Sequence, residues 1–192
     1  MITLIIVDCQ NDFISGTVRI KGASTILENI KNFIKNNKSK LSDIIFTVDW
    51  HPFNHCSFKK NGGNSVVHCV QFTPGSCIEP KLLKFVQSYN IKYQVSIKGD
   101  VSYFEQQGAF EDIDYLEDGT GSRYYFDSIV EANASNDFVI CGISGDYSVK
   151  HTIQNLLSGG IVPKVFLSGI ISADDGKIFN RFIEETNLEI VE

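Results

Sequence analysis

The sequence predicts an α/β protein built on a doubly wound, mostly parallel sheet of about six strands, with helices on both faces. Short apolar runs of strand length alternate with longer segments of helical periodicity, which is typical of βαβ units. The first run, "ITLIIV" (Ile2–Val7), is apolar on both faces, as expected for a central strand of a parallel sheet. The 192 residues, 43% of them hydrophobic, can bury a sizeable core, and we expect a single domain over residues 1–192.

Five further apolar runs have the length and flanking residues of strands. They cover residues 43–48, 93–97, 137–141, 164–168 and 188–191. Helical segments separate most of them, so these strands are expected to run parallel. Residues 50–79 and 99–121 are irregular and rich in glycine and polar groups. Because long loops in a compact domain are usually functional, these two segments are candidates for the site.

The helical segments are recognised mainly by apolar residues at helical spacing. They cover residues 26–36, 80–89, 122–132, 146–157 and 177–186. The first has Ile26, Ile30 and Phe33 on one side, which indicates the face that contacts the sheet. The second opens with Pro80, a favoured first residue of helices, and Gly159 follows the end of the fourth.

Charge and composition exclude several classes of partner. The net charge is -6 and no basic stripe occurs, so we expect no nucleic-acid partner. The N-terminus "MITLIIVD" has no basic leader and is expected to be a buried strand, not a signal peptide. No apolar run is long enough to span a bilayer, so no membrane partner is expected. The five cysteines show neither paired spacing nor a C-x-x-C motif, which predicts reduced thiols and a cytoplasmic location.

Reactive residues follow each of the first four predicted strands. These residues are Asp8, Asp49 with His51, Lys98, and the turn that carries Ser148. Parallel strands bring their carboxyl ends to one edge of the sheet, where α/β proteins bind ligands. Residues spread over 140 positions are therefore expected to share one pocket. The alternative for each aspartate or serine taken alone is a helix or turn cap.

Three of the four histidines fall within eighteen positions, together with an aspartate. Two imidazoles and a carboxylate suit zinc, iron or manganese in an open site. Asp49 and His51 can face one ion if the segment is extended, whereas His51 and His55 face together only if the segment is helical. The alternative is that these loop histidines only form hydrogen bonds.

The chain resembles the nicotinamidases, which belong to the isochorismatase-like cysteine hydrolases. "IIVDCQNDF" (Ile5–Phe13) resembles the first-strand signature of that family, and "TVDWHPFNHCSF" (Thr47–Phe58) resembles its metal loop. "HCVQFTPGS" (His68–Ser76) is similar to the segment with the last metal histidine, "KG" follows the third strand, and "CGISGDYSVKHT" (Cys141–Thr152) resembles the nucleophile turn. The resemblance implies an isochorismatase-like, Rossmann-like three-layer fold and the hydrolysis of nicotinamide to nicotinate and ammonia, with a place in pyridine nucleotide and NAD metabolism.

The resemblance also implies roles for individual residues. Asp8 takes the place of the general base, Lys98 that of its charged partner, and Ser148 that of the nucleophile. Phe13 is expected to line the substrate pocket, and Ser144 lies in the turn that supplies oxyanion donors.

The implied metal ligands are Asp49, His51 and His68, with waters completing the shell and zinc as the first expectation, iron and manganese being alternatives. The pyridine nitrogen of the substrate is expected to bind this ion. Self-association of the chain is a further expectation from the resemblance.

Several positions depart from the family pattern. The family nucleophile is cysteine, and this chain has Ser148. "SVVH" (Ser65–His68) replaces a common Trp-Pro before the last metal histidine, Ser144 and Gly145 replace Ala-Thr, and Phe72 stands where glycine is common. Three explanations stay open for Ser148: a deliberate change that inactivates a true amidase, a natural slow hydrolase, or a protein that binds the metal and a pyridine carboxamide without turnover. The missing Trp-Pro also leaves open hydrolysis of another small amide.

Three other groups have two interpretations each, and Cys141 has one. His151 is expected on a helix surface, the alternative being a Ser-His pair with Ser148. His55 and Cys56 are expected to support the metal ligands from behind, the alternative being direct ligation. Cys141 is expected in the core. "DDG" (Asp174–Gly176) is expected to form a turn and helix cap, the alternative being a cation site.

Overall fold

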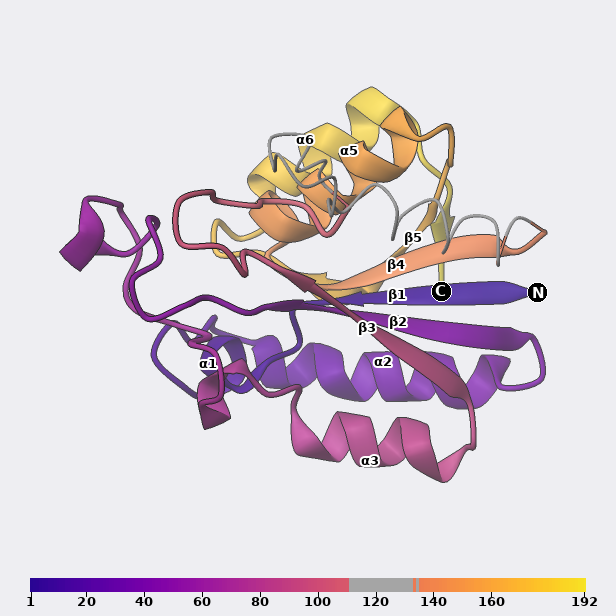
Figure 1. Ribbon diagram of the computed structural model, residues 1–192. Helices are drawn as coiled ribbons and strands as arrows, with labels where there is room; N and C mark the ends of the chain where they lie inside the picture. The colour runs from indigo at the N-terminus through magenta and orange to yellow at the C-terminus, as the bar shows by residue number, and fades with distance from the viewer. Residues whose placement is uncertain (111–132, 134) are drawn as a thin grey trace.

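The computed structural model of the protein describes residues 1–110, 133 and 135–192, and its centre is a sheet of six parallel strands (Figure 1). The strands are β1 (Ile2–Val7), β2 (Leu41–Asp49), β3 (Lys92–Lys98), β4 (Asp137–Ile143), β5 (Lys164–Ile171) and β6 (Ile190–Val191). Their order across the sheet is β3-β2-β1-β4-β5-β6. Strands β2 and β3 therefore lie on one side of β1, and strands β4 to β6 lie on the other. The predicted doubly wound α/β class is confirmed.

Strand β1 is buried on both faces because it pairs with β2 on one side and β4 on the other. Leu4 and Ile6 contact one hydrophobic core, and Ile5 and Val7 contact the other, since alternate residues of a strand point to opposite faces. This two-sided burial is the physical reason why the run is apolar at nearly every position.

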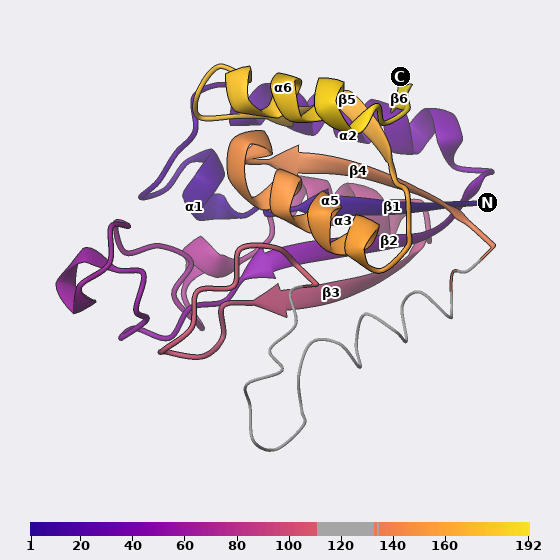
Figure 2. The same ribbon diagram turned by 90° about the horizontal axis from the view of Figure 1, so that it is seen from above.

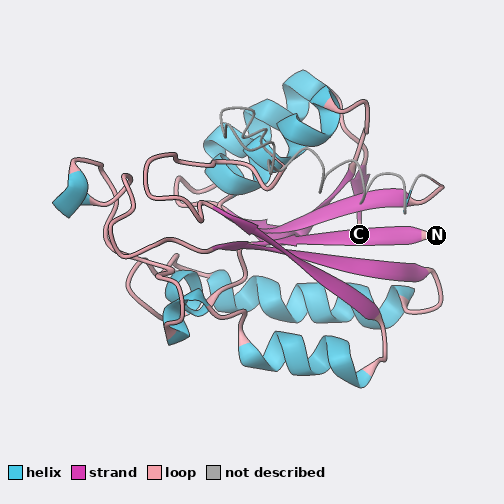
Figure 3. Ribbon diagram, in the orientation of Figure 1, coloured by secondary structure: helices cyan, strands magenta, loops and turns pink. Residues whose placement is uncertain are grey.

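Helices cover both faces of the sheet (Figure 3). The core on one face contains residues of α2 (Ala23–Asn37) and α3 (Pro80–Ser88), and the core on the other contains residues of α5 (Lys150–Ser158) and α6 (Lys177–Thr186). Seen from above, the strands point to the same side, and the loop after β2 extends beyond their carboxyl ends (Figure 2). Loops therefore lie at this edge of the sheet, beyond the helical layers.

Most predicted elements are present, with changed ends. The helix expected from residue 146 begins as a π-helical segment, Gly145–Val149, and continues as α5. The irregular segment 50–79 contains two short 3₁₀ helices, Lys59–Asn61 and Pro74–Ser76, and the short helix α1 (Asn11–Ile14) was not expected. The helix predicted over residues 122–132 lies outside the described residues. None of the helices in the described part of the chain is long and apolar enough to cross a membrane.

Candidate active site

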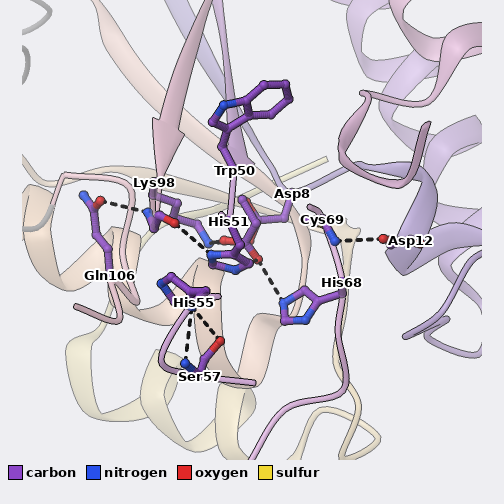
Figure 4. Close-up of polar contacts among 12 residues, drawn as sticks. Asp8, Asp12, Trp50, His51, His55, Ser57, His68, Cys69, Lys98 and Gln106 are labelled. Carbon is purple, nitrogen blue, oxygen red and sulfur yellow. Dashed lines mark hydrogen bonds and ion pairs between the residues drawn. The ribbon is translucent and has the colours of Figure 1, made fainter. Parts of the chain in front are cut away.

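Three charged side chains meet where β1, β2 and β3 end. Asp8 directly follows β1, and Asp49 and Lys98 are the last residues of β2 and β3, paired with each other in the sheet register. Nζ of Lys98 lies 3.0 Å from Oδ2 of Asp8 and also contacts Oδ1 of Asp49 (Figure 4). All three side chains are buried. The structure thus brings together these three predicted site residues, and Lys98 joins the two carboxylates.

Burial and charge act in opposite directions on the pKa values of this cluster. Burial raises the pKa of Asp8 above its ordinary value, and the Lys98 charge only partly opposes this effect. Burial also raises the pKa of Asp49, but Lys98 and the two neighbouring imidazoles outweigh it and hold that pKa well below the ordinary value. Burial by itself lowers the pKa of Lys98, but the charges of Asp49 and Asp8 outweigh it and raise that pKa. Lys98 is therefore an ammonium at neutral pH.

Ser148 lies in the π-helical turn after β4, and its side chain is buried. Its interaction with the Asp8 carboxylate lowers the pKa of that group, but the opposing effect of burial is larger. The turn begins at Ser144, which has left-handed backbone angles of φ 61° and ψ 63°. A Cβ atom at Gly145 would lie 2.5 Å from Oγ of Ser172 and 2.8 Å from Cγ2 of Ile170, so a larger residue there would require these side chains to move. The predicted grouping of Asp8, Lys98 and Ser148 is therefore present.

Asp49, His51 and His68 offer ligand atoms that all lie within 4.8 Å of one another. Nε2 of His51 and Nε2 of His68 are each 3.6 Å from Oδ2 of Asp49, which is too long for a hydrogen bond but suits two ligands of one ion. Nδ1 of His51 lies 2.9 Å from the carbonyl of Gly99, and Nδ1 of His68 lies 2.7 Å from the carbonyl of Val66. Each Nδ1–H donates to its carbonyl, which leaves the Nε2 lone pair free for a cation.

The buried Nε2 atom of His51 has no hydrogen-bond partner among the described residues. Such an orphaned nitrogen is costly unless a cation or water completes the site. The donor set of one carboxylate and two imidazoles fits zinc, iron or manganese. The residues therefore fit a divalent metal ion.

A short backbone pairing brings His68 to this site. The His51 N–H donates to the Cys69 carbonyl at 3.0 Å, and the Gln71 N–H donates to the His51 carbonyl at 2.8 Å. The Cys69 N–H donates to Oδ2 of Asp12 at 2.7 Å, and the Thr17 N–H donates to Oδ1 of the same carboxylate at 3.1 Å. Oδ2 of Asp12 thus anchors the segment that carries the candidate ligand His68, and Oδ1 holds Thr17.

Asp12 and Gln10 support the site but were not predicted from the sequence. Nε2 of Gln10 donates to the Asp49 carbonyl at 2.7 Å, and the Asp49 N–H donates to Oε1 of Gln10 at 2.8 Å. Both residues stand in the signature "IIVDCQNDF", so the motif itself was the available signal. Thr47 is a third, since its Oγ1 donates to Oδ1 of Asp8 at 3.1 Å.

A further support comes from the loop after β3. The Gly99 N–H donates to Oε1 of Gln106 at 3.1 Å, and the Gly99 carbonyl accepts from Nδ1 of His51. Gly99 has φ 65°, and a Cβ atom there would lie 2.5 Å from Cε1 of His51. Only glycine lets this backbone approach the imidazole so closely. Nothing in the sequence marked Gln106.

His55 lies beside His51, one of the candidate metal ligands. The two rings have centroids 4.1 Å apart, and a turn closed by the His55 N–H and the Pro52 carbonyl at 3.0 Å brings them together. The expectation that a helix was needed for this approach is therefore wrong, because a tight turn also reverses the chain. Burial, followed by the charge of His51, lowers the pKa of His55 to about 4. His55 is thus a neutral group at physiological pH.

Aromatic rings surround the histidines. Phe13 contacts His68 edge-on with ring centroids 5.5 Å apart, and Phe58, fully buried, contacts His51, His55 and His68. Phe72, which stands where the family often has glycine, is 89% exposed and contacts Trp50.

For Cys141 and Asp174 the structure confirms the expected core and helix-cap positions. Cys141 is buried, and burial raises its pKa, so it is an unreactive core thiol. Asp174 caps α6 by accepting from the Gly176 and Ile178 N–H groups at 3.0 and 2.7 Å. The His151 ring contacts Tyr147 on the same helical flank, with centroids 5.0 Å apart.

Comparison with known proteins identifies the family. The isochorismatase domain model matches residues 3–107, which is more than half of the chain. The chain belongs to the isochorismatase family. The nicotinamidase of Saccharomyces cerevisiae is 28% identical, with both chains covered completely. This likeness confirms the resemblance seen in the sequence and makes the chain an amidohydrolase of the nicotinamidase type.

Solved structures of the family have the same fold. A yeast nicotinamidase bound to the inhibitor nicotinaldehyde superposes with a TM-score of 0.83 and 27% identity over 100% of each chain. A pyrazinamidase of Pyrococcus horikoshii in complex with zinc superposes with a TM-score of 0.79 and 25% identity, covering 100% of this chain and 98% of the other. The isochorismatase-like fold is therefore confirmed over the length of the chain.

Proposed function

We propose that the chain acts on nicotinamide and hydrolyses it to nicotinate and ammonia, with Ser148 in place of the family cysteine. One observation carries this proposal: the ammonium of Lys98 contacts both Asp8 and Asp49. It therefore links the base beside Ser148 to the candidate metal ligands in one buried site. The relatives named as nicotinamidases and the solved complex with nicotinaldehyde support this substrate class.

In the proposed reaction, Oγ of Ser148 attacks the carboxamide carbon while its proton passes to Asp8. The proton then goes to the leaving nitrogen, ammonia departs, and an ester links the acyl group to Ser148. Water, deprotonated by Asp8, attacks this ester and releases nicotinate and the serine hydroxyl. Lys98 keeps Asp8 oriented between these steps. The N–H groups of the turn that starts at Ser144 are the proposed donors to the oxyanion.

Asp49, His51 and His68 are the proposed ligands of a divalent metal, with zinc first because a zinc-bound relative shares the fold. When bound, this ion supplies a Lewis-acidic attachment point for the pyridine nitrogen of the substrate. Phe13, beside His68, is proposed to line the pocket around the ring. Reaction in the cytoplasm and self-association stay predictions.

Ser148 favours a second candidate, a protein that binds the metal and a pyridine carboxamide without turnover. A serine hydroxyl is a far weaker acid than a thiol, so attack requires a well-placed base. The C–O bond is also shorter than the C–S bond, and a misplacement on the order of 1 Å costs about a hundredfold in rate. A deliberate exchange of cysteine for serine in an active amidase would give the same sequence.

Ammonia release from nicotinamide distinguishes these candidates when measured for the native chain and for Ser148→Cys. We expect slow release by the native chain and a rate at least about a hundredfold higher for the cysteine variant. Release by Ser148→Cys alone would mean an amidase scaffold that serine inactivates. No release from either form, with nicotinamide still bound in equilibrium dialysis, would contradict the amidase proposal and support the binding protein. A rate for pyrazinamide or another small amide far above that for nicotinamide would contradict the proposed substrate.

A further inference from the structure

A second group of metal-ligating side chains lies behind the candidate active site. His55, Cys56 and Glu105 offer ligand atoms within 4.8 Å of one another, and Asp49, His51 and His68 are a separate group. We propose that His55, Cys56 and Glu105 form a second site for a divalent cation that prefers nitrogen and sulfur ligands, such as Zn²⁺. Thiolate, imidazole and carboxylate are the ligand types that zinc takes in proteins.

His55 is oriented as the two histidines of the first group are. Nε2 of His55 lies 3.0 Å from the carbonyl of Phe104, and Nδ1 accepts from the Ser57 N–H at 3.3 Å, so the proton is on Nε2. The unprotonated Nδ1 faces Oε2 of Glu105 at 3.5 Å. His51 and His68 each bond one nitrogen to a backbone carbonyl and turn the other toward a carboxylate at 3.6 Å. A metal-binding histidine commonly shows this arrangement.

Glu105 supplies a buried oxygen to this group. Its Oε2 atom is buried and has no hydrogen-bond partner in the described part of the chain. A buried carboxylate oxygen is costly without a partner, and a bound cation would supply one. Glu105 and His55 come from loops that are 50 positions apart in the sequence. The fold therefore converges both ligands on one point.

The backbone around Cys56 is held in place on both sides. The Cys56 N–H donates to the Ser102 carbonyl at 2.7 Å, and Nδ2 of Asn61 donates to the His55 carbonyl at 2.9 Å. The first bond ties the loop after β2 to the loop after β3 near the thiol, and the second lies within the loop after β2. The Ser57 hydroxyl lies 2.8 Å from Nδ1 of His55 and the Ser57 N–H donates to the same atom at 3.3 Å, so both groups have to move away when a cation binds. Without a cation, these two groups satisfy the imidazole nitrogen.

The two groups differ in one way that an experiment can read. The first group has only oxygen and nitrogen ligands, whereas the second includes the sulfur of Cys56. Co²⁺ bound to a thiolate shows a charge-transfer absorption in the near ultraviolet that Co²⁺ bound to oxygen and nitrogen lacks. Titration of the metal-free full chain with Co²⁺ therefore reports the second group separately.

We expect two equivalents of Co²⁺ per chain, one of them producing the thiolate band. Cys56→Ala should remove this band and one equivalent, and Glu105→Gln should weaken the second equivalent at least about tenfold. Cys77→Ala is the matched control, because this thiol is exposed and outside both groups, and it should retain both equivalents. His68→Ala should lose the other equivalent and keep the thiolate band.

Three results would overturn the proposal: one equivalent without a thiolate band in the native chain, a band that persists in Cys56→Ala, or a band that depends on His68. Circular dichroism of each variant must match the native chain, and Cys56→Ser replaces Cys56→Ala if the alanine variant unfolds. Because His68→Ala tests the first group, failure of the second site is distinguishable from failure of the proposed amidase.

Discussion

The Nζ atom of Lys98 lies 3.0 Å from Oδ2 of Asp8, and both side chains are almost completely buried. The same ammonium contacts Asp49, so one positive charge lies between two carboxylates at the ends of neighbouring strands. Removal of one partner from such a buried arrangement leaves charges unpaired in a region of low polarity. The contact between Lys98 and Asp8 is therefore important for both stability and the proposed chemistry.

Lys98→Met should destabilise the fold by about 3–5 kcal/mol and abolish ammonia release, because two buried carboxylates lose their counterion. Urea unfolding monitored by circular dichroism measures the first effect. Lys92→Met is the control, since Lys92 is largely exposed and pairs with Asp43 at 3.3 Å, and its loss should cost less than about 1 kcal/mol. Equal losses in the two variants would mean that Lys98 does not balance the carboxylates.

The pH profile of ammonia release should have an acid limb above the ordinary aspartate pKa of 3.8, because burial raises the pKa of Asp8. A base works only when ionised, so kcat/KM should fall as the pH decreases through this raised value. The profile is to be recorded for the native chain and for Ser148→Cys, since both retain Asp8. A rate constant that stays level down to pH 3.8 would show that Asp8 is not the base.

Gly99→Ala should weaken zinc binding about tenfold or more, because the added Cβ would lie 2.5 Å from Cε1 of His51 and displace this ligand. Gly160→Ala is a matched control: Gly160 also has a positive φ, of 80°, but a Cβ there meets nothing within 4 Å. Both variants should lose a similar amount of stability from backbone strain, and only Gly99→Ala should lose zinc. Competition with a chromophoric chelator measures the affinities. Equal zinc affinity in the two variants would contradict the role of the close approach.

Asp12→Asn should lower zinc affinity by roughly ten- to a hundredfold, because an amide oxygen can replace only one of the two acceptors that hold Cys69 and Thr17. Asp146→Asn is the control, since one oxygen of Asp146 accepts from the Ala173 N–H at 3.1 Å and an amide oxygen can do the same. Zinc dissociation constants of both variants provide the measurement. Unchanged zinc binding in Asp12→Asn would mean that the segment of His68 is held by its other contacts.

Local patterns were sufficient for most of the fold. The run "ITLIIV" is strand β1 without a change of ends, and the helix predicted over Lys177–Thr186 has these bounds in the structure. The strand is marked by a continuous apolar run and the helix by its periodicity, and both patterns depend on neighbours in the sequence. The helix expected from residue 146 begins instead as the π-helical segment Gly145–Val149, which periodicity did not indicate.

The supporting residues of the site were harder to find than the charged ones. Asp8, Asp49 and Lys98 stand at strand ends, where their place in the sequence marks them. Gln106 and Asp12 act through backbone groups of Gly99 and Cys69, which are distant in the sequence. Such contacts depend on how the loops fold over the sheet, so spacing did not indicate Gln106, and only the family motif was a signal for Asp12.

By itself the sequence determined the α/β class, the strands whose ends carry reactive groups, and the family motifs from Asp8 to Ser148, because these depend on residue type and spacing along the chain. Only the tertiary structure decided that Lys98 contacts both carboxylates, that a turn stacks His55 on His51, and that Glu105 converges on His55. The physical reason is that the contacts of Lys98 and Glu105 join groups that follow different strands, and the stacking of His55 on His51 depends on a turn that spacing alone did not indicate. Their distances are set by the packing of the whole sheet and its helices.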